Sequence, residues 1–536
     1  MEKRNKPNLL IFVPDEMRGE VITNPQIRMP NMRGIREDGG VIFTQNFSAN
    51  PVCGPSRVCT FTGQYPHNGG HRSLYQFLRK GDENLFRILK ENGYDVIWAG
   101  RNDLFHKEAI KSSISKRIGG NTTNRIVKTL IKEGIRKYGL FRMLRIIRKA
   151  RKSKNMKSML HIPEIANLAE NIIGKRPFDM DSKWYNTFYF GELENVAQEM
   201  FEDDEIISHT LGYLDEYASK TKHRKPFCLY VAISLPHPPY HIEEPYFSMY
   251  DRSKLTPPYP LNLDLNDRAK KPAYATILHN KYGLDKLSDD DNREILATYY
   301  GMCTKVDGFF GRIVQKLKDL DLYDNTMVTS FADHGDYAAS YGLTEKWPSG
   351  MEDALLNVPL LVKLPNETAS LSQTASLTQT IDIFPTILEV AGIEHPYTHF
   401  GKSLLPVVRG GTETHRDAVY AEGGYDPREP QAFEDVGQSP DDPGFGIYFH
   451  KTNTQRVQPE TVCRTTMCRT EKWKLTLRTH PNAVEELYDL EKDPAEIHNL
   501  YSDPTYSKIV LELKEKILRW YLETSDNPHY YHKRDQ

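Results

Sequence analysis

The sequence predicts an α/β fold with a mostly parallel sheet flanked by helices, because strand-like and helical patterns alternate along the chain. Short apolar runs predict buried strands at 8–13, 94–99, 227–234, 326–332 and 359–364. Between them, apolar residues recur at helical spacing, most clearly in 83–92 and 292–320. Parallel strands need crossover connections of this kind, so the alternation favours this fold class.

Polar side chains closely follow four of the five predicted strands. They are Asp15 and Glu16, then Arg101, Asn102 and Asp103, then His237, and finally Asp333 and His334. In open α/β sheets, ligands bind at the carboxyl ends of the strands. We therefore expect these distant positions to meet in one active site.

The length of 536 residues is sufficient for one large domain and one smaller domain. We expect a catalytic domain over 1–410 and a small α+β domain over 411–536. Residues 423–460 are rich in Gly, Pro, Asp and Gln, which predicts a long loop that covers the pocket. Strand-like pieces at 462–469 and 473–478 and a helix over 506–523 complete the second domain.

The composition is that of an ordinary globular protein, with 39% hydrophobic residues, 26% charged residues and a net charge of −2. The sequence contains no apolar run long enough to cross a bilayer, so we expect no membrane partner, and we expect no nucleic-acid partner. The first residues lack the apolar length and cleavage site of a signal peptide. We therefore expect a cytoplasmic location, or a periplasmic or secreted one if a leader has been removed.

A basic insertion interrupts the predicted catalytic domain at 107–195. Between residues 106 and 159 there are 17 Lys or Arg and two Glu. Apolar residues recur at helical spacing from 124 to 152, and basic residues fill the other face. Two interpretations stay open. The insertion is either a solvated helix pair on the body, or a contact with an anionic substrate or with a partner subunit, as in a homo-oligomer.

Cys53 differs from the other five cysteines because it begins the segment Cys53-Gly-Pro-Ser-Arg57. Six cysteines are too few for a disulfide scaffold in a chain of this length. The segment reads as a loop-to-helix junction, where a helix N-terminus and Arg57 would lower the pKa of a thiol or hold an anion. From the residues alone, an inert buried thiol and a nucleophile have equal weight.

This segment resembles the signature of the sulfatase family, Cys-x-Pro-Ser-Arg followed by a spacer and Thr-Gly, here Thr62-Gly63. The family leucine before Thr-Gly is absent, since Phe61 stands there. The resemblance implies that a formylglycine-generating enzyme or an anaerobic sulfatase-maturating enzyme oxidises Cys53 to formylglycine (3-oxoalanine). The hydrated aldehyde then carries two hydroxyls, of which one attacks sulfur and the other later expels sulfate.

The resemblance extends over nearly the whole chain, and it implies an alkaline-phosphatase-like fold with one divalent metal ion. Asp15 and Glu16 stand where the family has paired metal-binding acids, usually Asp-Asp, and Asp333-His334 stands at the second metal pair. Together with Cys53 they form the expected ligand set. Oxygen ligands with one histidine make Ca²⁺ the first choice, and Mg²⁺, Mn²⁺ and Zn²⁺ are alternatives.

The resemblance also implies roles around the sulfate. Three cations, Arg57, Arg101 and Lys346, are expected to balance its charge. His237 stands at the family's His-Pro strand end and is expected to protonate the leaving alcohol, because histidine exchanges protons readily near neutral pH.

The chain departs from the family after the second predicted strand. Many sulfatases have Gly-Lys-x-His there, whereas this chain has Gly100-Arg101-Asn102-Asp103, with His106 further on. The pattern is similar to that of arylsulfatase K and related uronate 2-sulfatases. Whether Asp103 or His106 enters the site stays open at this point.

The sequence therefore predicts a sulfuric ester hydrolase that acts on a sulfated carbohydrate of the glycosaminoglycan or mucin type. One alternative is a phosphonate or phosphate-diester hydrolase of the same superfamily. Another is a non-catalytic binder of sulfated glycans in which Cys53 remains a thiol.

Overall fold

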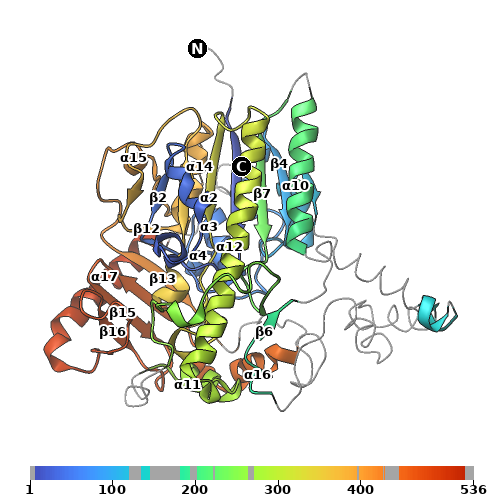
Figure 1. The fold of residues 1–536 in the computed structure, drawn as a ribbon. Coiled ribbons are helices and arrows are strands. Elements are labelled where there is room, and N and C mark those ends of the chain that lie inside the picture. The colour runs from blue at the N-terminus through green and yellow to red at the C-terminus, as the bar shows by residue number, and fades with distance from the viewer. Residues whose placement is uncertain are drawn as a thin grey trace.

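The structure is a computed structural model, in which a large α/β body carries a smaller C-terminal sheet (Figure 1). It describes residues 6–119, 135–139, 141–144, 182–193, 202–220, 224–262, 271–394, 397–426, 428 and 446–525. Most of the predicted basic insertion lies outside the described residues, including 124–152 except for 135–139 and 141–144. Among the described residues, no helix has the length and apolar character needed to cross a membrane.

The body is built on an eight-stranded sheet in which only β10 runs antiparallel to its neighbours. In spatial order the strands are β11 (Gln373–Thr374), β2 (Val41–Phe43), β10 (Leu360–Lys363), β9 (Thr326–Phe331), β1 (Asn8–Pro14), β7 (Phe227–Ile233), β4 (Asp95–Gly100) and β5 (Lys116–Ile118). The predicted α/β fold with a mostly parallel sheet is confirmed. All five predicted strands are present, within two residues of the expected bounds.

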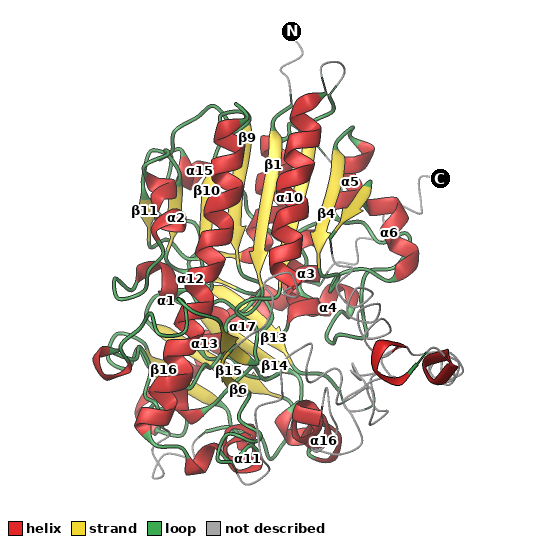
Figure 2. Ribbon diagram, turned by 45° about the vertical axis from the view of Figure 1, so that its right-hand side comes forward, coloured by secondary structure: helices red, strands yellow, loops and turns green. Residues whose placement is uncertain are grey.

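Helices cover both faces of this sheet. The central strand β1 is buried throughout, and its side chains alternate between two apolar clusters, with Phe12 in one and Ile11 in the other. The first cluster packs under α10 (Glu202–Ser219) and α12 (Asp289–Asp319), which Figure 2 shows in front of the strands. The second packs under α3 (Cys53–Thr62), α5 (Leu85–Glu91) and α14 (Ile383–Val390). The continuous apolar runs of the sequence reflect this burial on both faces.

The C-terminal part forms a four-stranded antiparallel sheet with a helix packed on it. Its elements are β13 (Val419–Gly423), β14 (Thr465–Arg469), β15 (Trp473–Arg478), β16 (Glu486–Asp489) and α17 (Ser507–Thr524). This confirms the smaller α+β part of the predicted fold class. The exact domain boundary at residue 410 stays a prediction.

The prediction of one continuous loop over 423–460 is wrong at its end, because residues 449–457 form helix α16 (Phe449–Val457). This helix packs against α11 (Ala273–Lys281), and the hydroxyl of Tyr282 accepts a hydrogen bond from the Lys451 backbone N–H. Contacts with a distant segment thus stabilise a helix whose own sequence gives a weak signal.

Shorter elements connect these parts. They are α1 (Glu20–Thr23), α2 (Pro30–Arg33), β3 (Asn46–Phe47), α4 (Pro66–Gly69), α6 (Lys107–Ser113), β6 (Tyr189–Glu192), β8 (Tyr240–Ile242), α13 (Asp353–Leu356), β12 (Thr378–Gln379) and α15 (Leu405–Val408).

Candidate active site

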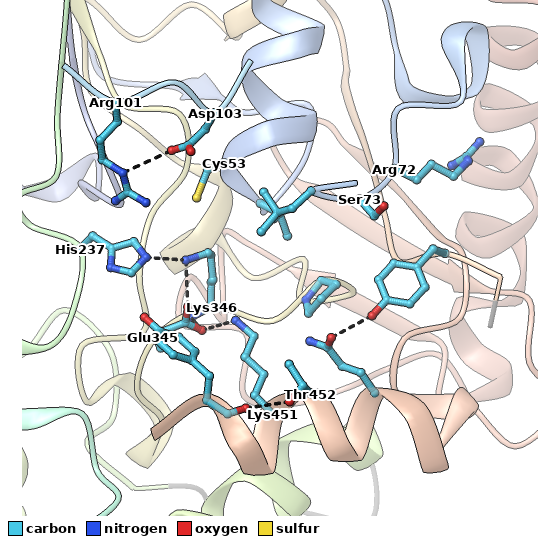
Figure 3. A pocket seen from close by; sticks show the side chains of 16 residues that line it. Cys53, Arg72, Ser73, Arg101, Asp103, His237, Glu345, Lys346, Lys451 and Thr452 are labelled. Atoms are coloured by element: carbon cyan, nitrogen blue, oxygen red, sulfur yellow. Dashed lines mark hydrogen bonds and ion pairs between the residues drawn. The ribbon is translucent and has the colours of Figure 1, made fainter. Parts of the chain in front are cut away.

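The polar residues that follow the parallel strands meet at one end of the sheet, as predicted. Asp15 and Glu16 follow β1, Arg101 and Asp103 follow β4, His237 follows β7, and Asp333 and His334 follow β9. A pocket above them is lined by Cys53, Arg101, Asp103, His237 and Lys346 (Figure 3).

Cys53 is the first residue of α3, and its side chain is buried at the base of the pocket. Its Sγ lies 3.4 Å from Oδ1 of Asp15 and 3.1 Å from Nε2 of His334. Burial, followed by the charges of Asp15 and Asp333, raises the pKa of the Cys53 thiol well above its ordinary value. Of the two expected effects of this position, a lowered thiol pKa and anion binding, the first was wrong, because burial and the neighbouring carboxylates outweigh Arg57.

Arg57 lies one helical turn after Cys53 and joins three acidic side chains below the pocket. Its Nε donates to Oδ2 of Asp333 at 2.8 Å, and its Nη2 donates to Oδ2 of Asp15 at 3.2 Å. Its Nη1 lies 3.8 Å from Oδ2 of Asp103. Burial alone would raise the pKa of Asp15, but Arg57, followed by His237 and Arg101, holds it well below its usual range.

Four of the five predicted metal ligands gather closely enough to hold one ion. Each of Asp15, Glu16, Cys53 and His334 offers a donor atom, and these atoms all lie within 4.8 Å of one another. The fifth, Asp333, stands at the edge, with its Oδ1 4.0 Å from Nε2 of His334. Its oxygens accept hydrogen bonds from the backbone N–H of Glu16, the backbone N–H of His334 and Arg57.

These donors fit a divalent cation. The buried Oε2 of Glu16 has no hydrogen-bond partner among the described residues. The ring of His334 directs Nδ1 to the carbonyl of Gly335 at 2.8 Å, which leaves the lone pair of Nε2 for a ligand. Carboxylate oxygens with one imidazole are the donor set expected of Ca²⁺, Mg²⁺, Mn²⁺ or Zn²⁺.

Lys346 stands beside this cluster, and its ammonium contacts polar groups of three neighbouring side chains. Its ammonium donates to Oε1 of Glu16, to Oε1 of Glu345 at 2.8 Å, and to Nε2 of His237 at 3.3 Å. The Nδ1 of His237 faces the carbonyl of Pro238 at 2.6 Å, which turns Nε2 toward the pocket. Lys346 and His237 therefore lie side by side where the predicted sulfate would bind.

The structure places Asp103, and not His106, in the pocket. Oδ2 of Asp103 lies 3.5 Å from Nε of Arg101. His106 instead precedes α6, with its ring 5.9 Å from that of Phe77. The strand before Arg101 ends at Gly100, whose φ of +100° and close approach to the carbonyl of Ala232 leave no room for a side chain.

Sequence reasoning missed two groups of pocket residues. One face of α16 and the residue before it contribute Tyr448, Lys451, Thr452 and Gln455, and the opposite wall has Arg72 and Ser73. The positions 448, 451, 452 and 455 are spaced as one face of a helix, and this was the signal that could have found them. Glu345, which neighbours Lys346, was also missed.

Strained backbone is concentrated around the pocket. Glu16 and Glu345 have φ values of 66° and 63°, and Ala338, Ala339 and Tyr341 in the preceding loop are also left-handed. A residue in this conformation costs about 1–2 kcal/mol unless it is glycine. The buried Arg18 holds the loop by donating to the Tyr337 carbonyl at 3.1 Å and to Ser340 at 2.7 Å. The glutamate backbones are held as well, because Tyr299 Oη donates to the Glu16 carbonyl at 2.8 Å and the Tyr337 N–H donates to the Glu345 carbonyl at 3.1 Å.

The fold and the site together define a hydrolase of anionic esters: a parallel α/β sheet whose strand ends present acids, an imidazole and several cations around a buried nucleophile candidate. The sequence model of the sulfatase family matches residues 7–393, so the chain belongs to the sulfatase family of the alkaline phosphatase superfamily. It is accordingly an enzyme of the class that hydrolyses sulfate esters. A second model, described as N-sulphoglucosamine sulphohydrolase, C-terminal, matches residues 446–522.

Two curated relatives match almost the whole chain. The multifunctional alkaline phosphatase superfamily protein PehA of Trinickia caryophylli is 25% identical over 97% of this chain and 96% of its own length. Arylsulfatase K of Mus musculus is 24% identical over 99% of this chain and 83% of its own length. The earlier resemblance to arylsulfatase K is therefore confirmed.

Solved structures share the fold over 98% of this chain. A phosphonate monoester hydrolase of Agrobacterium radiobacter superposes with a TM-score of 0.71 at 22% identity, covering 97% of its chain. A protein solved with its substrate D-glucosamine-2-N,6-O-disulfate superposes with a TM-score of 0.66 at 17% identity, covering its whole chain.

Proposed function

We propose that this chain hydrolyses a sulfate ester on a saccharide and that formylglycine, formed from Cys53, is its nucleophile. The observation that carries the proposal is the position of Cys53. Its side chain stands at the base of the pocket, between the carboxylate of Asp15 and the imidazole of His334, with the arginines and the lysine around it. No other described cysteine lines this pocket.

The two groups that the proposal requires have distinct tasks. Formylglycine, once hydrated, supplies a hydroxyl for attack on sulfur and a second hydroxyl that allows the enzyme to release sulfate. A divalent ion held by Asp15, Glu16, Asp333 and His334 would polarise the sulfate oxygens as a Lewis acid.

The chain's own side chains bind and orient the ester. Arg101 lines the pocket and is held by Asp15 and Asp103, so its N–H groups are directed before the anion arrives. Arg57 lies below the pocket, where its charge balances Asp15 and Asp333. Lys346 adds a third positive charge. His237 turns Nε2 toward the pocket, where it accepts a hydrogen bond from Lys346; once protonated at Nε2, the ring would pass that proton to the leaving oxygen.

A saccharide is favoured as the carrier of the sulfate because the outer pocket is polar and aromatic. Tyr425, Tyr448, Thr452 and Gln455 offer two rings, a hydroxyl and an amide. The description of the C-terminal family match and the structural neighbour solved with a glucosamine disulfate also support a sulfated sugar.

The test compares initial rates on three substrates after co-expression with a maturation enzyme: an aryl sulfate, an aryl phosphodiester and a panel of defined sulfated saccharides. We expect the highest kcat/KM on one of the saccharides and measurable turnover of the aryl sulfate. A Cys53→Ala variant prepared in the same way is the matched control. Faster turnover of the phosphodiester than of every sulfate would contradict the proposal.

The second candidate is hydrolysis of a phosphonate or phosphate diester. The observation that favours it is the likeness in fold to two solved phosphonate monoester hydrolases, each with a TM-score of 0.71. The same three-substrate comparison separates the two functions. The remaining alternative, a glycan binder with an unmodified Cys53 thiol, predicts binding of sulfated saccharides without turnover of any substrate.

A further inference from the structure

Lys346 faces two carboxylates. Its ammonium donates to both Glu16 and Glu345, and the three side chains are buried. Glu16 belongs to the predicted metal ligand set, where a divalent ion would balance its charge, so Glu345 is the remaining negative charge at Lys346. A Glu345 carboxylate without a second cation would repel the sulfate that Lys346 is expected to bind.

A second lysine restores the balance from a distant segment. Lys451, on α16, donates to Oε2 of Glu345, while Lys346 occupies Oε1 of the same carboxylate. Oε2 also accepts the backbone N–H of Lys346 at 2.7 Å. The three hydrogen bonds that this carboxylate accepts therefore come from the two lysines, two from Lys346 and one from Lys451. Figure 3 shows Glu345 between the two lysines.

We propose that Lys451 is a positioning residue for anion binding: by pairing with Glu345, it keeps Lys346 available for the sulfate. The inference deepens the proposed function and rests on it only for the identity of the anion. It makes α16 part of the active site, although this helix lies outside the residues 7–393 that match the sulfatase model. The left-handed backbone of Glu345, whose N–H donates to Tyr240 Oη at 2.8 Å, fits this role because it fixes the carboxylate between the lysines.

This arrangement makes a prediction that direct substrate binding by Lys451 does not make. Removing Lys451 alone leaves the Glu345 charge uncompensated beside Lys346, so anion binding should weaken. Removing both charges should restore the balance, since the two partners act as a unit. If Lys451 instead touched the substrate, removal of Glu345 would bring no recovery.

The experiment is a double-mutant cycle read out by calorimetric titration of inorganic sulfate into the Ca²⁺-loaded Cys53→Ala protein. The variants are Lys451→Met, Glu345→Gln and their combination. Lys472→Met is the matched control, because Lys472 forms an exposed pair with Glu491 in the turns next to β15 and β16, and neither residue lines the pocket. We expect Lys451→Met to weaken sulfate binding about tenfold, Glu345→Gln to leave it as tight or tighter, and the double variant to return to within about threefold of the parent.

Thermal melting of each variant checks folding. If Lys451→Met is unstable, Lys451→Arg replaces it in the test. Because Arg keeps the positive charge, this variant should bind sulfate like the parent. In the matured enzyme, Lys451→Met should raise KM for a small aryl sulfate, and the double variant should return KM toward the parent value. The changes in kcat should be smaller. The proposal would be overturned if the double variant bound sulfate as weakly as Lys451→Met, or if Glu345→Gln lost as much sulfate affinity as Lys451→Met. A parent protein that does not bind sulfate would also overturn it. A failed proposed function looks different: the cycle in sulfate binding persists, while no sulfate ester is turned over.

Discussion

The Nε2 of His334 lies 3.1 Å from the Sγ of Cys53, although 281 residues separate the two along the chain. The contact joins the end of β9 to the start of α3, and it places the predicted nucleophile in direct contact with a predicted metal ligand. Modification of Cys53, metal binding and catalysis are therefore expected to depend on one another.

Removal of the metal should lower both stability and activity. The carboxylates of Asp15 and Asp333 share Arg57, and Oε2 of Glu16 is buried without a partner among the described residues. A chelator should therefore lower the melting temperature, and Ca²⁺ at about 100 times its Kd should restore about 2.7 kcal/mol. Differential scanning fluorimetry with Ca²⁺, Mg²⁺, Mn²⁺ and Zn²⁺ measures the response. His334→Ala should abolish the rise in melting temperature on metal addition. A wild-type melting temperature that none of the four ions changes would refute the metal site.

Arg57→Ala should destabilise the fold and not only reduce turnover. The substitution leaves two fully buried carboxylates, Asp15 and Asp333, without their shared cation. Loss of one partner of a buried pair costs about 3 kcal/mol or more. Denaturant unfolding of the metal-free proteins measures the loss. The exposed Arg519, paired with Glu515 on α17, is the control, and Arg519→Ala should change stability by less than about 1 kcal/mol. Similar losses for the two variants would argue against a role for Arg57 in this cluster.

Asp103→Asn and His106→Ala should have different effects on kcat. Asp103 lines the pocket and lies beside Arg101 and Arg57, whereas His106 packs outside it. We expect kcat for an aryl sulfate to fall at least about tenfold with Asp103→Asn. The variant removes the charge that orients Arg101, and a misplaced oxyanion-binding group typically lowers kcat by this factor or more. His106→Ala should stay within about threefold of wild type. The reverse order would show that the catalytic role belongs to His106.

The sheet of the C-terminal part should give a pH-dependent contribution to stability. Burial raises the pKa of Glu496 to about 7, even though Lys474 opposes the shift, with Nζ 2.5 Å from Oε1. The folded chain therefore keeps this proton up to about pH 7, while the unfolded chain releases it near 4.5. The stabilisation that this bound proton provides is fully present below the Glu496 pKa of the unfolded chain. It is lost as the pH rises through the Glu496 pKa of the folded chain.

Between pH 5 and pH 8, the free energy of unfolding of the wild type should accordingly fall by on the order of 2 kcal/mol more than that of Glu496→Gln. Unfolding in denaturant at the two pH values measures the difference, and the exposed Glu491 provides a control through Glu491→Gln. Parallel pH profiles for wild type and Glu496→Gln would contradict the assignment.

The sequence predicted the central sheet well because its strands are buried on both faces. Strands β1, β7 and β9 appear as continuous apolar runs, and the polar residues after them marked the site. Short strands such as β2 and β12 carry no such signal, since they form only when a distant segment pairs with them.

The same reason explains what was missed in the pocket. Lys451 is more than a hundred residues from Glu345, and the helix that carries it is stabilised by α11. The direction of the Cys53 pKa shift was also missed, because the local sequence shows Arg57 but neither the burial of the thiol nor the acids that follow β1 and β9. Motifs identified the chemistry, whereas the electrostatic balance needed the three-dimensional arrangement.

The most direct test of the central claim is the mass of the Cys53 peptide, measured alongside aryl sulfate turnover. After co-expression with a maturation enzyme, formylglycine should make this peptide lighter by about 18 Da than the thiol form. The account predicts that turnover rises in proportion to the converted fraction and is absent from Cys53→Ala. Full turnover in a sample whose Cys53 remains entirely a thiol would contradict it.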